Sequence, residues 1–154
     1  MTGIDELKVS QEAWIAIHQL VAEFAYTVDI GNGADTPELF TEDGWYETDT
    51  GQSTGRAAIR RAYERRAARG PRTARHIFTN LQIFRDEDGS YRGLSILLLF
   101  GADGVPPFDP DPILVADVED VYAFDGETAL LRSRRLRSVF ERSSSAPVLP
   151  LGED

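Results

Sequence analysis

Hydrophobic residues recur at intervals of three or four along the first part of the chain, and this spacing gathers side chains on one face of a helix. The positions that share the face are Trp14, Ile17, Val21, Phe24 and Val28. Ser10 is suited to cap the start of such a helix, and the Gly31-Asn32-Gly33 segment is suited to end it. The pattern predicts one helix that runs to about Asp29, which falls on the border between the apolar and polar faces.

The rest of the chain changes from helical to strand-like spacing. The pattern predicts, in chain order, a short helix over 36–40, a strand over 44–48, a turn over 51–55, a helix over 56–69, and strands over 72–85, 91–100, 113–124 and 129–141. Helices followed by an antiparallel meander indicate one α+β domain over residues 10–142, with the helices on one face of the sheet. Residues 1–9 and 143–154 are expected to be tails, the second because it combines serines, prolines and terminal acids.

The predicted strands have apolar residues on both faces. In the 72–85 strand, Phe78 and Phe84 belong to one alternating set, whereas Ile77 and Ile83 belong to the other. A sheet with one solvated face would alternate cleanly between apolar and polar residues. Because the helices cover only one face, we expect another subunit to cover part of the other face, and hence a homo-oligomer.

The composition of the 154-residue chain excludes several classes of function. The net charge of −10 argues against a nucleic-acid or anionic-membrane surface, which needs clustered Lys and Arg. The absence of cysteine excludes thiol nucleophiles, thiolate metal sites and disulfides. No segment approaches the ~20 apolar residues of a membrane span, and no secretory signal is visible, so a cytoplasmic location is expected.

Two histidines are the first candidates for acid–base chemistry, because the ordinary pKa of histidine lies near neutrality. His18 lies in the middle of the first helix and is interpreted as a structural residue. His76 is predicted to share a strand face with Phe78 and Asn80. An apolar surface with few polar groups is typical of a pocket wall. A hydrogen-bonded structural histidine remains an alternative for His76.

Asp29 is the candidate partner of a histidine base. A carboxylate that points inward at the end of the first helix would accept a hydrogen bond from an imidazole, fix its tautomer and stabilise its charged form. The alternative is that Asp29 caps the helix or faces water. Such a pair needs neither metal nor cofactor, and the acidic segments around Asp109 and Asp117 do not have the spacing of a metal site.

Five segments, in this order, resemble the SnoaL-like group of the nuclear transport factor 2-like superfamily over roughly residues 10–142. They are Ala25–Asp29, Leu39–Gly44, Gly55–Ile59, Arg75–Asn80 and Val115–Tyr122. The resemblance implies a cone-shaped α+β domain, in which N-terminal helices pack in a curved, mainly antiparallel mixed sheet that encloses a pocket.

Within that group, the chain is most similar to the branch of scytalone dehydratase, bile-acid dehydratase and hexachlorocyclohexane dehydrochlorinase. Those enzymes use an Asp at the end of the first helix and a His on the strand after the third helix, and Asp29 and His76 occupy these positions. The resemblance implies that His76 abstracts a proton, that Asp29 orients it, and that no cofactor takes part. It also implies a trimer, with a dimer as the alternative.

Some residues of this chain differ from those of this branch, and the differences bear on which substrate is expected. Val28 stands where scytalone dehydratase has Tyr, and Ser95 stands near the place of its second His, which argues against scytalone itself. The expected substrate is a small or polycyclic apolar molecule. Arg134 matches an Arg near the leaving group in the dehydrochlorinase. The residues expected to bind the substrate are Tyr46, Phe78, Asn80, Arg134 and Trp14.

Other functions on the same fold remain open. One is a non-catalytic partner that resembles the small subunit of aromatic-ring dioxygenases, and another is a ligand-binding or polyketide-cyclase-like domain. In a variant of the lyase or isomerase hypothesis, Asp29 itself is the base. Activity would then persist without His76 but fail without Asp29.

Overall fold

The structure is a computed structural model that describes residues 8–143, 149 and 151–152. The described residues form the helices α1 (Gln11–Asp29) and α2 (Arg56–Ala68) and the 3₁₀ helix η1 (Thr36–Leu39). Ser10 caps α1 as predicted, since its hydroxyl accepts a hydrogen bond from the Ala13 N–H at 3.1 Å. The helix ends just before the predicted Gly31-Asn32-Gly33 stop.

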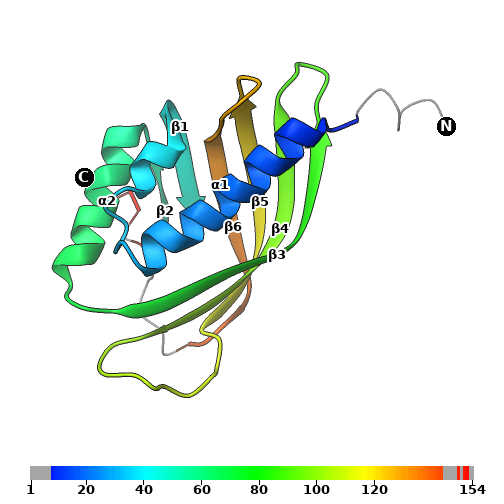
Figure 1. The fold of residues 1–154 in the computed structure, drawn as a ribbon. Coiled ribbons are helices and arrows are strands. Elements are labelled where there is room, and N and C mark those ends of the chain that lie inside the picture. The colour runs from blue at the N-terminus through cyan, green and yellow to red at the C-terminus, as the bar shows by residue number, and fades with distance from the viewer. Residues whose placement is uncertain (1–7, 144–148, 150, 153–154) are drawn as a thin grey trace.

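The described strands form one mixed sheet (Figure 1). They are β1 (Phe40–Thr48), β2 (Gly51–Thr54), β3 (Thr73–Arg85), β4 (Tyr91–Ala102), β5 (Leu114–Phe124) and β6 (Ala129–Glu141). Their spatial order is β2-β1-β6-β5-β4-β3, and neighbours are antiparallel except for the parallel pair β1 and β6. The predicted α+β fold is confirmed. The turn predicted over 51–55 is wrong in part, because 51–54 is the short strand β2, which pairs with β1.

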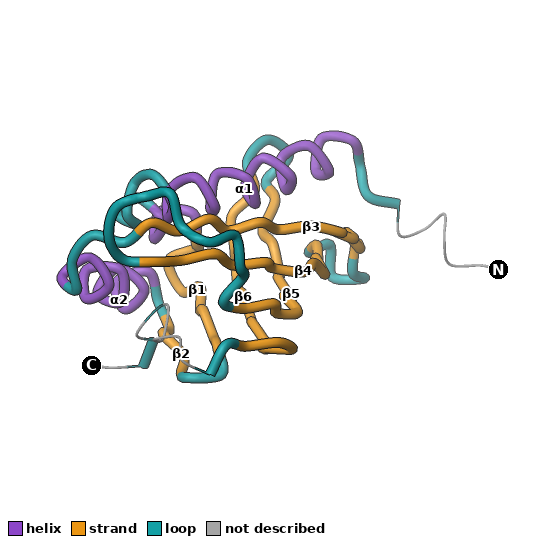
Figure 2. The backbone as a smooth tube through the Cα atoms, turned by 90° about the horizontal axis from the view of Figure 1, so that it is seen from below, coloured by secondary structure: helices purple, strands orange, loops and turns teal. Residues whose placement is uncertain are grey.

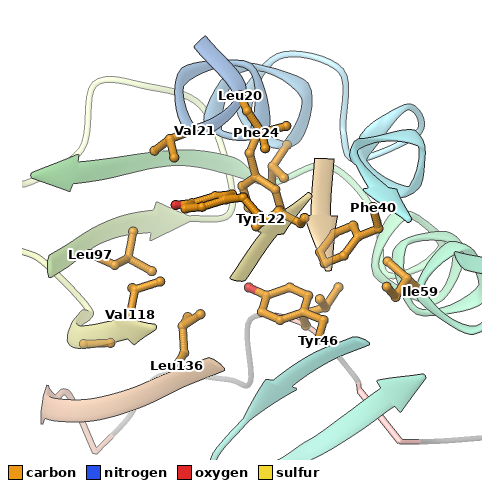
Figure 3. Close-up of a cluster of buried hydrophobic side chains, with 14 of the residues drawn as sticks. Leu20, Val21, Phe24, Phe40, Tyr46, Ile59, Leu97, Val118, Tyr122 and Leu136 are labelled. Atoms are coloured by element: carbon orange, nitrogen blue, oxygen red, sulfur yellow. The ribbon is translucent and has the colours of Figure 1, made fainter. Parts of the chain in front are cut away.

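The helices pack on the same side of the curved sheet, at different ends of it. Figure 1 shows β3 passing beneath α1, and Figure 2 shows α2 beside β1 and β2. The core lies between these layers and includes Leu20 and Phe24 from α1 and Leu97 from β4 (Figure 3). Burying each such side chain contributes roughly 1.5–3 kcal/mol to folding. The two layers leave space for a site between the C-terminal end of α1 and the helix α2.

Trp14 does not lie on the buried face of α1, contrary to the prediction. The buried residues of the helix are Ala13, Ile17, Leu20, Val21, Phe24, Thr27 and Val28. Trp14 is 51% exposed and packs on His18, with ring centroids 4.0 Å apart. Ala13 lies four positions and Trp14 three positions before Ile17, so either could belong to the buried face. Hydrophobicity favours Trp14, but the structure buries Ala13.

The C-terminal segment contributes to the core where a tail is expected. Leu149 and Leu151 are buried, and the Gly152 N–H donates a hydrogen bond to the Ser53 hydroxyl at 3.3 Å. Of the expected N-terminal tail at 1–9, Val9 packs against the core, whereas residues 1–7 lie outside the described residues. Residues 144–148, 150 and 153–154 also lie outside them. At least one part of the 143–154 segment therefore belongs to the domain.

Among the described helices, none has the length and apolar character needed to cross a membrane. The cytoplasmic location stays a prediction.

Candidate functional site

A cavity of about 110 Å³ lies between the helices and the sheet. Its walls are largely apolar, and the apolar lining residues are Val28, Leu97, Leu99, Ile113, Leu114, Leu136 and Leu149. The buried or half-buried polar side chains that line it are Tyr46 and Thr48 from β1, Tyr63 and Arg66 from α2, and His76 from β3. Exposed residues such as Thr50 form its mouth. An apolar cavity with few polar groups is typical of a small-molecule site.

The Asp29 carboxylate binds His76 at two points. Oδ1 of Asp29 lies 2.6 Å from the ring Nδ1 of His76, and Oδ2 accepts the His76 backbone N–H at 2.8 Å. The two side chains are only 7% and 8% exposed, for His76 and Asp29 respectively. Hydrogen bonds to a charged acceptor are stronger when water is excluded. Asp29 therefore fixes both the main chain and the ring of His76.

The fold explains why these two residues meet. β3 is an edge strand, so alternate N–H groups along it face away from the sheet and lack a strand partner. The His76 N–H is one of these groups, and α1 packs on β3 so that its last residue, Asp29, reaches this N–H. The border position of Asp29 on the helix thus faces the sheet edge and not water.

The bond to Asp29 determines which ring nitrogen of His76 is available. An ionised carboxylate only accepts hydrogen bonds, so Nδ1 carries the proton of the neutral ring and Nε2 carries the lone pair. The ring also packs against Phe78, with centroids 6.5 Å apart and an interplanar angle of 17°. Because His76 lines the cavity, Nε2 is the nitrogen suited to take a proton from a molecule inside it.

Tyr46 and Tyr63 present neutral hydroxyls to the cavity. Burial raises the pKa of Tyr46 to about 12 and raises the pKa of Tyr63 well above its ordinary value. Both phenols are therefore hydrogen-bond donors at neutral pH. Figure 3 shows the Tyr46 side chain pointing inward from β1. Gly33 makes room for Tyr63, since its φ is +81° and a Cβ there would collide with the Tyr63 ring.

Arg66 is a cavity residue that the sequence interpretation missed. It continues the buried face of α2 after Ile59, Ala62 and Tyr63, so the spacing of three or four residues carried the signal. Its Nη1 donates a hydrogen bond to Oδ1 of Asn32 at 2.8 Å, and Asn32 adopts a left-handed φ of 52° in the loop after α1. Burial lowers the pKa of Arg66, but a guanidinium remains charged in proteins.

Arg134 points inward from β6 but does not line the cavity. Its Nε and Nη2 donate to the two carboxylate oxygens of Asp120, both at 2.8 Å, and the Tyr122 hydroxyl donates to the same carboxylate. The guanidinium also lies over the rings of Phe24 and Phe78, 4.1 and 4.5 Å from their centroids. Arg134 is thus the centre of a fully buried ion pair within the core, and the structure does not bring it to a substrate in this cavity.

Asn80 does not share a strand face with His76, contrary to the prediction. The register between β3 and β4 shifts between Thr79 and Gln82, and Asn80 adopts a left-handed φ of 56°. Such a bulge adds one residue and reverses the alternation of the strand beyond it. Asn80 and Gln82 consequently line a separate hollow, together with Arg135 of β6, away from His76.

Of the five residues expected to bind substrate, Tyr46 lines the cavity. Phe78 packs beside the His76 ring and against Phe24, and Trp14 lies at the exposed start of α1. Within residues 8–143, 149 and 151–152, no group of three or more His, Asp or Glu side chains is placed to hold a metal ion.

Comparisons with known proteins agree with this architecture. The SnoaL-like domain family matches residues 11–144. ActVI-ORFA from Streptomyces coelicolor is 25% identical and has a TM-score of 0.69, over 82% of this chain and 97% of its own. A scytalone dehydratase-like protein from Novosphingobium aromaticivorans is 22% identical with a TM-score of 0.72, over 92% and 94% of the two chains. The comparison with curated proteins finds no match.

A third similar structure is a beta subunit of the aromatic-ring-hydroxylating dioxygenase kind, from the same Novosphingobium species. Its superposition on this chain has a TM-score of 0.74. It is 18% identical, over 88% of this chain and 94% of its own. At this identity the likeness shows a shared fold alone, and the same holds for the scytalone dehydratase-like protein.

Proposed function

The chain belongs to the SnoaL-like domain family, and from this premise we propose that it is a cofactor-independent lyase or isomerase whose general base is His76. The observation that carries the proposal is the 2.6 Å contact between Asp29 Oδ1 and His76 Nδ1 in the wall of an apolar cavity. The contact with Asp29 occupies Nδ1 and leaves the lone pair of Nε2 for a molecule in the cavity. Here Nε2 makes no hydrogen bond to a described residue.

The proposed reaction begins when Nε2 of His76 removes a proton from a substrate carbon. The electron pair of the broken C–H bond forms a new C=C double bond. In an elimination, the leaving group departs with the electron pair of its own bond, and the imidazolium then gives up its proton to that group or to water. In an isomerisation, the imidazolium returns the proton to another carbon. Asp29 stabilises the imidazolium between these steps.

The neutral tyrosines suit a reaction in which negative charge develops on a substrate oxygen. Tyr46 and Tyr63 donate hydrogen bonds and carry no charge of their own, because burial keeps the pKa of both phenols high. A single donor of this kind is worth roughly 10²–10³ in rate in enzymes that stabilise an oxyanion.

The cavity favours a small substrate over a polycyclic one. Its volume is about 110 Å³. An engineered cavity of ~150 Å³ binds benzene, whereas drug-sized ligands need ~300–1,000 Å³. We therefore propose a single-ring or short-chain substrate with a C–H bond next to an electron-withdrawing group.

Deuterium exchange tests the base without knowledge of the leaving group. Cyclohexanone and butanone are incubated with the protein in D₂O, and loss of their α-proton signals is followed by NMR. The wild type is expected to exchange ~10²–10⁴-fold faster than His76→Ala, and the matched control His18→Ala should equal the wild type.

Other outcomes of this experiment would overturn the proposal. Equal rates in the wild type and His76→Ala would contradict it. Exchange that persists in His76→Ala but is lost in Asp29→Asn would assign the base to Asp29 instead. Exchange no faster than in buffer would favour a ligand-binding domain without catalysis.

We also propose that the protein is a homo-oligomer, with a trimer favoured over a dimer. The face of the sheet that points away from the helices carries exposed apolar side chains, among which Ile77 is 46% and Phe140 is 69% exposed. Clusters of this kind mark interaction surfaces in soluble proteins. Light scattering at micromolar concentration is expected to give the mass of a trimer, and a monomer would contradict the proposal.

A further inference from the structure

Arg66 is a buried cation that lines the cavity, and no acidic side chain of a described residue forms an ion pair with it. The residue is 5% exposed, and Nη1 donates to Asn32 Oδ1 at 2.8 Å. Its Nε atom is buried and has no hydrogen-bond partner among the described residues. The ion pairs of the described chain do not include Arg66. Asp29, the one carboxylate with an electrostatic effect on it, is already bound to His76.

Arg134 shows how this fold neutralises a buried guanidinium. Its Nε and Nη2 form one edge of the planar group, and this edge binds both oxygens of Asp120. In Arg66, by contrast, the side-chain partner of Nη1 is the neutral amide of Asn32. A buried charge without an ionic partner is unfavourable, so an anion in the cavity would complete the surroundings of Arg66.

We propose that the guanidinium of Arg66 binds a carboxylate of the substrate, so that the site takes a small carboxylic acid in its ionised form. This inference rests on the proposed function, because it takes the cavity to be the substrate site. Guanidinium and carboxylate groups match in a two-bond geometry that an alcohol or an amide does not reproduce. Arg66 is therefore a substrate-binding and specificity-determining residue.

The surroundings of Arg66 suit a carboxylate at the inner end of the cavity. The neutral hydroxyls of Tyr63 and Tyr46 line the same space and add donors without adding negative charge. Asp49 and Glu141 lie at the exposed mouth, where water and salt screen their negative charges against an entering carboxylate. A volume of about 110 Å³ accommodates one ring or a short chain with this group.

The position of Arg66 relative to the base gives the anion a role in the reaction. Arg66 enters the cavity from α2, and His76 enters from the edge strand β3. A carboxylate held on the helix side would place the rest of a small molecule between the two residues, with a C–H bond toward Nε2 of His76. Holding the reacting groups in this way contributes to catalysis through orientation.

Calorimetric titration with benzoate and its uncharged analogue benzyl alcohol tests the inference. Benzoate is expected to bind the wild type, and benzyl alcohol to bind at least tenfold more weakly. Arg66→Gln should weaken benzoate binding about 10- to 100-fold, the scale of a lost charge-assisted hydrogen bond, and Arg66→Lys should recover part of it. Arg61→Gln, which removes the same charge from the exposed side of α2, should bind benzoate like the wild type.

Failure of this inference and failure of the proposed function are separable. His76→Ala should keep its affinity for benzoate, because the binding of the benzoate carboxylate to Arg66 does not require the His76 side chain. Equal affinity of the wild type for benzoate and benzyl alcohol, or no benzoate binding, would overturn the inference even if His76 proves to be a base. Undiminished benzoate binding by Arg66→Gln would also overturn it, and if that variant does not fold, Arg66→Lys and the two ligands on the wild type decide.

Discussion

Asp29 holds His76 twice across 47 positions of sequence, through its ring Nδ1 at 2.6 Å and through its backbone N–H at 2.8 Å. One carboxylate at the end of α1 therefore sets the tautomer of the imidazole and also ties the helix to the edge strand. The geometry of the proposed base depends on the packing of α1 on β3. A change at Asp29 should consequently alter stability and chemistry together.

Replacing Asp29 with Asn tests this double role. Asn keeps the shape of the side chain but removes its charge, so the Nδ1–H tautomer of His76 should lose its dominance. The free energy of unfolding should fall by ~1–3 kcal/mol, the usual scale for a buried charge-assisted hydrogen bond. Nitrogen NMR of the imidazole and urea denaturation measure the two effects. Asp35→Asn, at an exposed position with no side-chain capping bond, should change neither.

We expect the loss of one partner of the Arg134–Asp120 ion pair to destabilise the core more than the loss of both. Arg134→Met leaves the Asp120 carboxylate buried without its partner, so unfolding should become easier by ~3–5 kcal/mol. The double variant Arg134→Met/Asp120→Leu should be more stable than Arg134→Met alone, as measured by urea denaturation. The half-exposed pair of Arg92 and Asp86 is the control, since Arg92→Met should cost no more than ~1 kcal/mol. A double variant less stable than Arg134→Met would contradict the argument.

Gly33 should be far less tolerant of a side chain than Gly89, although both have a positive φ, +81° and +86° respectively. Gly33→Ala forces a methyl group into the Tyr63 ring, whereas nothing lies within 4 Å of a Cβ at Gly89. Overpacking of this kind costs ~1–3 kcal/mol beyond the backbone strain that both positions share. Thermal or urea denaturation of the two variants measures the difference, and equal losses would show that Tyr63 moves aside freely.

Tyr46 should make the fold sensitive to alkaline pH. Burial raises its pKa from 10.0 to about 12, so above about pH 10 the unfolded chain ionises first and the folded state loses stability as the pH rises toward 12. The loss approaches about 1.4 kcal/mol per pH unit for one such group.

Urea denaturation at about pH 9 and about pH 11 measures this effect, and Tyr46→Phe should lose about 1 kcal/mol less stability than the wild type between those values. The exposed Tyr26→Phe is the control and should behave like the wild type. Identical losses in Tyr46→Phe and the wild type would contradict the assignment.

Most elements could be predicted from the sequence because their signals are local. The capping Ser10, the glycine stop after Asp29 and the alternation of the later strands depend on residues close together in the chain. The strand β2 lacked such a signal. Its segment has the glycines of a turn, and only pairing with β1 makes it a strand.

The site was predicted less completely, for reasons that lie in non-local geometry. Asn tolerates a left-handed φ better than most residues, but this tolerance does not reveal a bulge, so strict alternation placed Asn80 on the wrong face. Arg134 was expected to face a substrate, but Asp120 on the neighbouring strand binds it. Arg66 had a readable signal in the periodicity of α2, yet its charge suggests a solvated position unless the cavity is known.

The central claim, that His76 is a general base supported by Asp29, is tested most directly by the kinetics of α-proton exchange of butanone in D₂O. A base removes the α-proton, the electron pair of the C–H bond forms the enolate, and the enolate takes up deuterium from the solvent. We predict that kcat/KM for the wild type exceeds that of His76→Ala by ~10²–10⁴-fold, while His18→Ala matches the wild type. Equal rates for the wild type and His76→Ala would contradict the claim.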